Sequence, residues 1–555
     1  MSRFVIGVDF GTLSARALLV DAASGAEVAE ASAPYSHGIL DSAFFDGHPL
    51  PPLYAIQHPA DYPEALSRIV HELLSSAGIT PSEVAGIGVD FTSCTILPVD
   101  EKGIPLCQNP FFEREKHAYV KLWKHHAAVR EAEEIEARAI ESCEPLLENY
   151  GGKISCEGML PKILQILREA PDIYYAAARF IEAGDWITWM LTGTETHSAS
   201  YAAYKALWDP ENGYPSDTFL SSLDTRLVGR CGGRISNVIL PVGASAGRLS
   251  SYGAELTGLS KGTPVSVPQI DAHAGMAALN ITGEGDMLMI VGTSACHIIN
   301  STIGKPIPGI CGVVRDGVMP GLYTYEAGQA GFGDIFEWFV RTGVPASYDE
   351  EARGRGIDIH TLLCEKATRL CPGESHIIAL DWLNGNRSTL VDPGLSGALF
   401  GMTLSTRPEE IYRAWIESVA YGTRRIIEQF EEYGVPVKTV CAAGGIAKKN
   451  PMLMQICSDV TGLPIRVAAT SQAGALGSAV YAAVACGLFS SVADASACFA
   501  KPPVRVYEPI PENRRIYDEL YAEYRRLYDL FGRDGDPLMK NLNRIRDGKE
   551  PQITR

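Results

Sequence analysis

Long apolar runs, basic clusters and paired cysteines are all missing from this sequence of 555 residues. No apolar stretch approaches the roughly 18 residues from which a membrane span is recognised, so we expect no membrane association. The net charge is −18, and no run of Lys or Arg gathers positive charge. Because neutralising a phosphate backbone requires a basic surface, we expect no nucleic-acid partner.

The cysteines show no pairing pattern. They number 13 and are scattered, with no C-x-x-C pair and no Cys/His cluster at zinc spacing. In a chain of this length that pattern favours reduced thiols over disulfides or a zinc site. The first residues, "MSRFVIGVDFG", lack a signal-peptide cleavage pattern, so the expected compartment is the cytoplasm.

Two common nucleotide-binding loops are missing as well. The absence of a G-x-x-x-x-G-K-S/T loop disfavours a P-loop fold. Gly328, Gly331 and Gly333 in "EAGQAGFGDIFEWF" do not have G-x-G-x-x-G spacing, so a nicotinamide cofactor is not expected. A nucleotide would have to be held by another kind of loop.

What the chain does contain is an alternation of strand and helix patterns. Its length exceeds the size at which one hydrophobic core keeps growing, so at least two domains are expected. Residues 4–10, 15–22, 26–33 and 84–91 predict strands. Before the last of these, a helix is predicted from Asp61, which would be its cap. This order is typical of α/β construction.

The opening of the chain is repeated near its middle. "FVIGVDFGTLSARALLVDA" and "DMLMIVGTSACHIIN" each place a Gly-Thr turn between two apolar strands. We interpret the repeat as two related domains, 1–275 and 276–555. In the second, Thr406 and Glu409 at capping-box spacing predict the start of a long helix, which a strand–helix series and a helical tail follow.

The two Gly-Thr turns are candidate phosphate sites. A glycine turn presents backbone N–H groups with little bulk above them, and the threonine adds a hydroxyl. The turns at Gly11–Thr12 and Gly292–Thr293 could therefore hold the phosphates of one nucleotide between the domains. Asp9, at the end of the first strand, would then hold Mg²⁺. The alternative is that both glycines only make tight turns.

A third glycine cluster, "AAGGIAKKNPML", follows a predicted strand. Gly444 and Gly445 would let an adenine ring approach the backbone, while Lys448 and Asn450 would supply polar contacts or a helix cap. A plain strand-to-helix turn is the alternative.

Asp271, in "VPQIDAHAG", has two interpretations. It caps a helix, or in a cleft facing ATP it accepts the proton of an attacking hydroxyl. The neighbouring His273 would lie inside that helix, and we interpret it as structural.

Taken together, "DFGT", "QIDAHAG", "GTS" and "GG" with "KNP" resemble the FGGY family of carbohydrate kinases. The resemblance implies an α/β, two-domain actin/hexokinase/Hsp70-like (ribonuclease H-like) fold with the active site in the interdomain cleft. Domain 1–275 would bind the sugar and hold the first phosphate loop. Domain 276–555 would bind ATP and carry the helical tail.

Within the family, segments such as "GVDFTSCTILPVD", "EGMLPKILQI" and "GGIAKKNPMLMQI" are similar to members that phosphorylate L-ribulose. This implies ATP and Mg²⁺, transfer to the 5-hydroxyl of L-ribulose in L-arabinose breakdown, and a homodimer. Asp271 would be the general base and Asp9 the metal-associated carboxylate. The sugar would contact Ser93, Trp123, Lys205, Asp271 and Glu326. The nucleotide would contact Gly11, Thr12, Ser14, Arg16, Gly292, Thr293, Ser294, Gly333, Glu337, Gly444, Gly445, Lys448 and Asn450.

Two alternatives remain open at this point. A family member acting on another ketopentose or a polyol, such as D-ribulose, xylulose or ribitol, would keep the same nucleotide motifs. A non-enzymatic ATP-binding relative would need no sugar. The sequence also departs from the expected pattern at Gly331 and Phe332, which we expect beside the nucleotide pocket.

Overall fold

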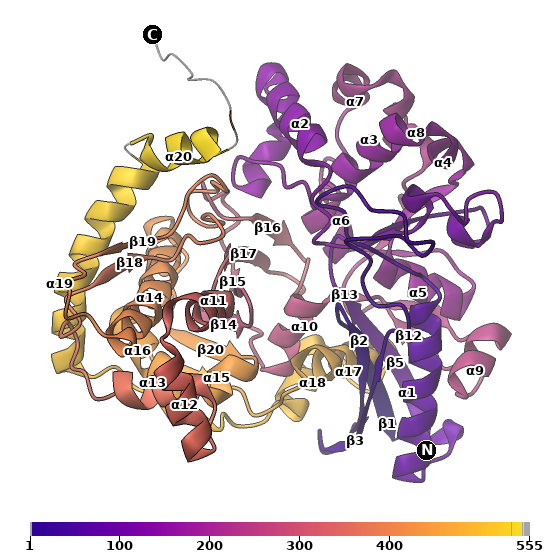
Figure 1. Ribbon diagram of the computed structural model, residues 1–555. Coiled ribbons are helices and arrows are strands. Elements are labelled where there is room, and N and C mark those ends of the chain that lie inside the picture. The colour runs from indigo at the N-terminus through magenta and orange to yellow at the C-terminus, as the bar shows by residue number, and fades with distance from the viewer. Residues whose placement is uncertain (1–2, 534–535, 547, 549–555) are drawn as a thin grey trace.

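The computed structural model describes residues 3–533, 536–546 and 548 and shows two lobes, each built around a seven-stranded sheet (Figure 1). The first sheet contains β11 (Ser245–Arg248), β12 (Pro264–Ser266), β5 (Val84–Phe91), β1 (Phe4–Phe10), β2 (Ser14–Asp21) and β3 (Glu27–Pro34) in this order, with β13 (Gln269–Ile270) beside the end of β5. β1, β2 and β3 are antiparallel neighbours, whereas β5 is parallel to β1 and β12 is parallel to β5.

The second sheet repeats this topology. Its order is β16 (Gly312–Arg315), β17 (Tyr323–Gln329), β15 (Ala295–Ser301), β14 (Asp286–Val291), β20 (Thr439–Ala443), β21 (Ile465–Val467) and β22 (Arg505–Tyr507). β14, β15 and β17 are antiparallel neighbours, and β20 and β21 follow β14 in parallel. The strand pairing thus supports the interpretation of the sequence repeat as two related halves.

Helices cover both sheets and extend the first lobe. The small sheets are β4 (Ile56–Gln57), β7 (Val120–Lys121), β6 (Ile96–Val99) and β8 (Arg179–Glu182), then β9 (His197–Ser198) with β10 (Ile239–Leu240), and β18 (Ile378–Leu380) with β19 (Ala398–Phe400). The first-lobe helices are α1 (Asp61–Ala77), α2 (Val129–Ser142), α3 (Met159–Glu169), α4 (Pro171–Ala176), α5 (Ala183–Thr192), α6 (Ala199–Lys205), α7 (Asp217–Leu223), α8 (Arg230–Gly233), α9 (Ser251–Thr257) and α10 (Asp271–Ala278). The second half contributes α11 (Gly333–Gly343), α12 (Ala346–Arg355), α13 (Ile359–Ala367), α14 (Pro408–Glu432), α15 (Gly445–Lys449), α16 (Pro451–Thr461), α17 (Ala473–Ala485), α18 (Val492–Phe499), α19 (Pro511–Tyr528) and α20 (Leu538–Arg546).

One pair of helices joins the lobes. Although α17 comes late in the sequence, it packs on β1 and β5 of the first sheet and lies against α10 (Figure 1). A Cβ on Gly477 would overlap the carbonyl oxygen of Ala274 in α10. The hydrophobic core of the first lobe continues through these helices to Leu288 and Ile298 of the second sheet. Separating the lobes would therefore expose a continuous core.

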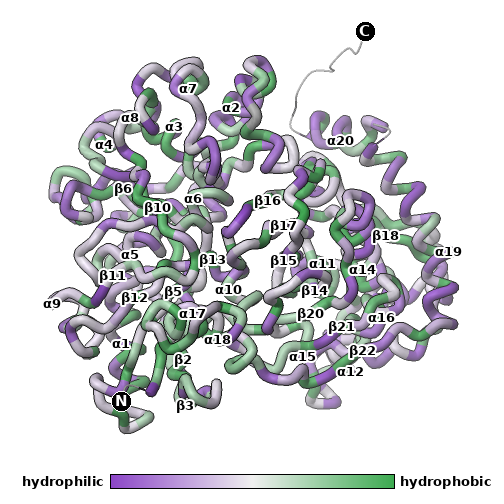
Figure 2. The backbone as a smooth tube through the Cα atoms, turned by 180° about the vertical axis from the view of Figure 1, so that it is seen from behind, coloured by the Kyte–Doolittle hydropathy of each residue, from purple (hydrophilic) through white to green (hydrophobic). Residues whose placement is uncertain are grey.

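Hydropathy follows this arrangement. Figure 2 shows hydrophobic residues along the central strands and α17, whereas α19 at the rim alternates between hydrophobic and hydrophilic. The buried face of α19 carries Tyr517, Tyr521, Tyr524 and Tyr528. Within the described ranges, no helix is both long and apolar enough to cross a bilayer.

Both predicted helix caps are wrong in detail. α1 begins at Asp61, but the side chain of Asp61 makes no capping bond and instead accepts from the backbone N–H of His37 at 3.1 Å. At α14, the N-cap is Arg407 rather than Thr406, and the capping-box acid is Glu410. Each carboxylate bonds to the N–H that the folded chain brings nearest, which spacing in the sequence alone does not specify.

Replacing Gly477 by Ala tests the contact between α10 and α17. Although Ala is the better helix former, we expect Gly477→Ala to lower the free energy of unfolding by about 1–3 kcal/mol, the usual cost of overpacking. Gly354→Ala in α12 is the control, because its added Cβ meets nothing within 4 Å. Urea unfolding measures both variants, and equal stability for Gly477→Ala and the unmodified protein would contradict the close contact.

Candidate active site

Three carboxylates meet where strands of the first sheet end. Asp9 on β1 and Asp90 on β5 are direct neighbours in the parallel register. Gln269 of β13 is paired with Asp90, and the chain then turns into α10 at Asp271. Asp90 was not among the predicted site residues. The repeated letters "GVDF" at 7–10 and 88–91 are the signal that would have identified it.

The Asp9–Asp90 pair is strongly destabilised in its doubly charged form. Burial raises the pKa of Asp9, and burial together with the charge of Asp9 raises the pKa of Asp90 well above its usual range. Asp90 accepts from the hydroxyl of Ser478 at 2.7 Å through Oδ2, while its buried Oδ1 has no hydrogen-bond partner among the described residues. Two adjacent carboxylates with an unsatisfied oxygen fit a hard divalent cation.

Asp271 begins α10 but does not cap it. The N-cap of α10 is Ile270, and Asp271 Oδ1 accepts from the adjacent N–H of Ala272 at 2.7 Å. Burial and the charge of Asp9 raise the pKa of Asp271 to about 7. A carboxylate with that pKa can accept a proton near neutral pH.

Glu326 on β17 lies at the centre of a cationic cluster. Its Oε2 accepts from Lys205 at 3.1 Å and from His273 Nε2 at 3.2 Å, and its Oε1 accepts from Arg387 at 3.0 Å. Burial by itself would raise the pKa of Glu326, but Lys205, His273 and Arg387 outweigh it and hold that pKa well below its usual range. Burial lowers the pKa of His273, so its neutral ring donates from Nε2, while Nδ1 lies 3.4 Å from the hydroxyl of Ser200.

Arg387 is the member of this cluster that sequence analysis missed. It follows β18 in the second lobe, far in sequence from Lys205 and His273, and "NGNRSTL" carries no recognisable motif around it. With Lys205 from α6 and His273 from α10, it makes Glu326 the meeting point of segments from both halves.

Three hydrogen bonds fix the first Gly-Thr turn. Gly11 N–H donates to Ser14 O at 3.1 Å, Gln57 donates to Thr12 O at 2.8 Å, and the indole N–H of Trp123 donates to the Thr12 hydroxyl at 3.1 Å. Trp123 thus lies against the predicted phosphate turn. Ser93 is half-buried in the loop after β5, and Arg16 on β2 is paired in register with Asp9.

In the second Gly-Thr turn the hydrogen bond that closes the turn spans one residue fewer than in the first. Gly292 N–H donates to Ser294 O at 3.0 Å, and the loop that starts α11 closes on it, since the Gly333 N–H donates to Gly292 O at 3.0 Å. Phe332 donates to Thr293 O at 2.8 Å, but its side chain is buried in the second-lobe core. Phe332 therefore borders the second Gly-Thr turn through its backbone, while its side chain packs in the core.

A cavity of about 1420 Å³ opens beside this second turn. It is large enough for a nucleotide, since ligand pockets usually occupy about 300–1,000 Å³. Asp358, His360 and Tyr412 also line it, and sequence analysis did not identify them. The predicted residues that line it are Gly292, Thr293, Gly333, Glu337, Gly445 and Asn450.

In the third glycine cluster, Gly444 is needed for the turn, whereas Gly445 faces open space. Gly444 has φ 102°, and a Cβ there would overlap Val291 O, so this position needs glycine to make the turn. Gly445 has open space above it and lines the cavity. Lys448 donates to Ala469 O at 2.6 Å, and Asn450 caps α16 by accepting from Leu453 N–H at 3.0 Å.

Family models match the first lobe and most of the second. The N-terminal domain of the FGGY family of carbohydrate kinases matches residues 4–278, and its C-terminal domain matches residues 287–486. The chain belongs to the FGGY family of carbohydrate kinases. It is 48% identical to the ribulokinase of Bacillus licheniformis, with 96% of this chain and 98% of that protein covered. It is 45% identical to the ribulokinase of Mycolicibacterium smegmatis, with 100% and 98% covered.

Solved structures agree on the fold. The xylulose kinase from Rhodospirillum rubrum has a TM-score of 0.80 at 23% identity, with 97% of this chain and 100% of that chain covered. The gluconate kinase from Lactobacillus acidophilus has a TM-score of 0.80 at 18% identity, with 96% and 98% covered. The predicted two-domain α/β fold of FGGY kinases is thus confirmed.

The pKa of Asp271 leads to a pH prediction. If Asp271 must be unprotonated to accept a proton, kcat/KM should fall as the pH drops below about 7. Asp271→Asn should remove that acidic limb and lower kcat by about 10²–10⁴-fold. Asp172→Asn, on the exposed surface of α4, is the control. Steady-state rates between pH 5 and 9 measure both, and an unaltered profile in Asp271→Asn would contradict the assignment.

The ion pair of Arg387 leads to a second prediction. Arg387→Gln removes one charged hydrogen bond from Glu326, which is worth about 1.5–3 kcal/mol. We expect the KM for the sugar to rise by about tenfold or more, while the KM for ATP changes little. Arg353→Gln on α12 is a matched control because Arg353 is exposed. Unchanged sugar affinity in Arg387→Gln would show that Arg387 does not position Glu326.

Proposed function

We propose that this kinase transfers the γ-phosphoryl group of ATP to the 5-hydroxyl of L-ribulose, giving L-ribulose 5-phosphate and ADP, in the breakdown of L-arabinose. The observation that carries the proposal is the identity of 45–48% to ribulokinases over nearly the whole chain. The carboxylates Asp9, Asp90 and Asp271 and the cavity beside the second Gly-Thr turn supply polar sites that such a reaction needs.

In this proposal the two lobes hold the two substrates. The sugar binds among Ser93, Trp123, Lys205, Asp271 and Glu326. ATP occupies the cavity of the second lobe, with its phosphates between the turns at Gly11–Thr12 and Gly292–Thr293. Asp271 takes the proton of the 5-hydroxyl as its oxygen bonds to the γ-phosphorus, and ADP leaves with the electrons of the broken P–O bond. The deprotonated form of Asp271 is accessible at neutral pH.

The cluster around Glu326 would orient the sugar. Lys205 has donors that can reach a ketone or hydroxyl oxygen, and its position is fixed by Glu326. The indole of Trp123 offers an apolar face to the sugar carbons while its N–H is bonded to Thr12. Exclusion of water from this cleft would limit wasteful hydrolysis of ATP.

Asp9 and Asp90 are the residues that would hold Mg²⁺. A bound Mg²⁺ offsets the negative charge of the transferred phosphoryl group and of the carboxylate pair. The raised pKa values of both groups and the unsatisfied Asp90 Oδ1 support this placement. The protein is also proposed to act in the cytoplasm as a homodimer.

A panel of acceptors tests the proposal. ADP release with ATP and Mg²⁺ should depend strictly on added sugar and be fastest with L-ribulose among L-ribulose, D-ribulose, L-xylulose, D-xylulose, ribitol, arabitol and glycerol. Preference for another acceptor would keep the carbohydrate kinase and reject L-ribulose as its substrate. Release without any acceptor dependence would reject the sugar-binding assignment as well.

A further inference from the structure

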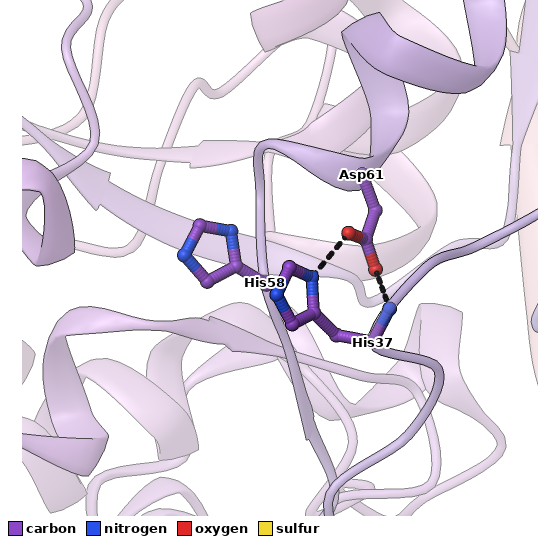
Figure 3. A group of neighbouring side chains, drawn as sticks. All are labelled: His37, His58 and Asp61. Carbon is purple, nitrogen blue, oxygen red and sulfur yellow. Dashed lines mark hydrogen bonds and ion pairs between the residues drawn. The ribbon is translucent and has the colours of Figure 1, made fainter. Parts of the chain in front are cut away.

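Two histidines and an aspartate meet in the first lobe outside the candidate active site described above. His37, His58 and Asp61 each offer a ligand atom, and these atoms lie within 4.8 Å of one another. His37 follows β3, while His58 and Asp61 stand on either side of the turn between β4 and α1 (Figure 3). Because the residues come from two separate segments, the fold brings them together, and no spacing in the sequence predicts the cluster.

The ligand atoms already make hydrogen bonds that a bound ion would replace. His58 Nδ1 accepts from the backbone N–H of Ala60 at 3.2 Å, so its lone pair is directed at that amide. Asp61 is buried, and its oxygens lie 2.6 Å from His37 Nδ1 and 3.1 Å from the His37 N–H.

Aromatic side chains enclose the two imidazoles while leaving one side open. The His37 and His58 rings stack with centroids 4.7 Å apart at 23°. Phe45 packs edge-on against both rings, and Tyr119 packs against His58. The His37 side chain is 43% exposed, so an ion can enter from solvent while three protein ligands hold it.

The same two segments support the first phosphate turn. Tyr35, two residues before His37, donates its hydroxyl to Gly11 O at 2.9 Å. Gln57, next to His58, donates to Thr12 O at 2.8 Å and accepts from the Tyr62 hydroxyl at 2.8 Å. A ligand that ties His37 to His58 would therefore stiffen both supports of the Gly11–Thr12 turn.

We propose that His37, His58 and Asp61 bind one divalent transition metal of the zinc class, and that its binding stiffens the phosphate turn. Two imidazoles and a carboxylate are ligands that Zn²⁺ accepts, whereas Mg²⁺ prefers oxygen ligands and water. Three protein ligands leave the fourth tetrahedral position to water.

Titration with Zn²⁺ alone, in protein free of nucleotide and Mg²⁺, tests the site. Calorimetry should show one equivalent that His58→Gln and His37→Gln each weaken by about tenfold or more. His48→Gln is the matched control, because His48 is exposed and pairs with Asp46 at 2.9 Å outside the cluster. Cys143 and Cys371 are exposed thiols that can also bind Zn²⁺. The site is therefore judged by the difference in Zn²⁺ affinity between each variant and the unmodified protein.

Hydrogen exchange locates the effect. Zn²⁺ should slow amide exchange at residues 35–38, 57–62 and 11–14 in the unmodified protein and in His48→Gln, but not in His58→Gln. Thermal unfolding without metal verifies that each variant is folded. A Zn²⁺ isotherm unchanged by both His58→Gln and His37→Gln would overturn the site. Protection at residues 35–38 and 57–62 without protection at 11–14 would overturn its coupling to the phosphate turn.

Discussion

The backbone contact of α17 with the first sheet is the constraint on which the site depends. A Cβ on Gly7 would overlap Ala475 O, and one on Gly88 would overlap Ser478 O. At this separation the helix brings Ser478 into hydrogen-bonding distance of Asp90. It also sets Gly474 so close that an added Cβ would stand 3.1 Å from both Asp9 Cγ and Asp90 Oδ1. The packing that joins the lobes therefore also builds the carboxylate pair.

Two kinds of buried carboxylate follow from this architecture. Burial raises the pKa of Asp9, Asp90 and Asp271, and the charge of Asp9 raises the pKa of the other two further. A bound cation or a proton would offset this cost. Glu326 is satisfied already by Lys205 and two partners beside it. The cleft thus places groups that lack counter-charge next to one whose charge is fixed, which suits a site that binds Mg²⁺ and a polar sugar.

The differences between sequence analysis and structure each have a physical origin. Asp61 and Thr406 carry the expected residue types for helix caps, but a tertiary contact gives Asp61 another partner. At α14 the Thr406 hydroxyl accepts from Thr403 N–H instead, and the cap is Arg407. Arg387 lies in a segment without a motif, and its role depends on meeting Glu326 across the fold. Phe332 follows a glycine loop, yet the core of the second lobe takes its ring. Long-range contacts decided the positions of Asp61, Arg387 and Phe332, whereas hydrogen bonds between near neighbours in the sequence decided the cap of α14.

The sequence by itself determined the α/β class, the two related halves, the Gly-Thr turns and the family, because strand periodicity, turn residues and the motif order are local properties of the chain. It also indicated Asp9 and Asp271 through their places at strand ends. Only the tertiary structure decided that Asp90 stands beside Asp9, that Arg387 reaches Glu326, and that His37 meets His58. The repeated "GVDF" marks Asp90 as a candidate, but the residues of each pair are separated by tens of positions, and their contact arises from the pairing of strands and the packing of helices.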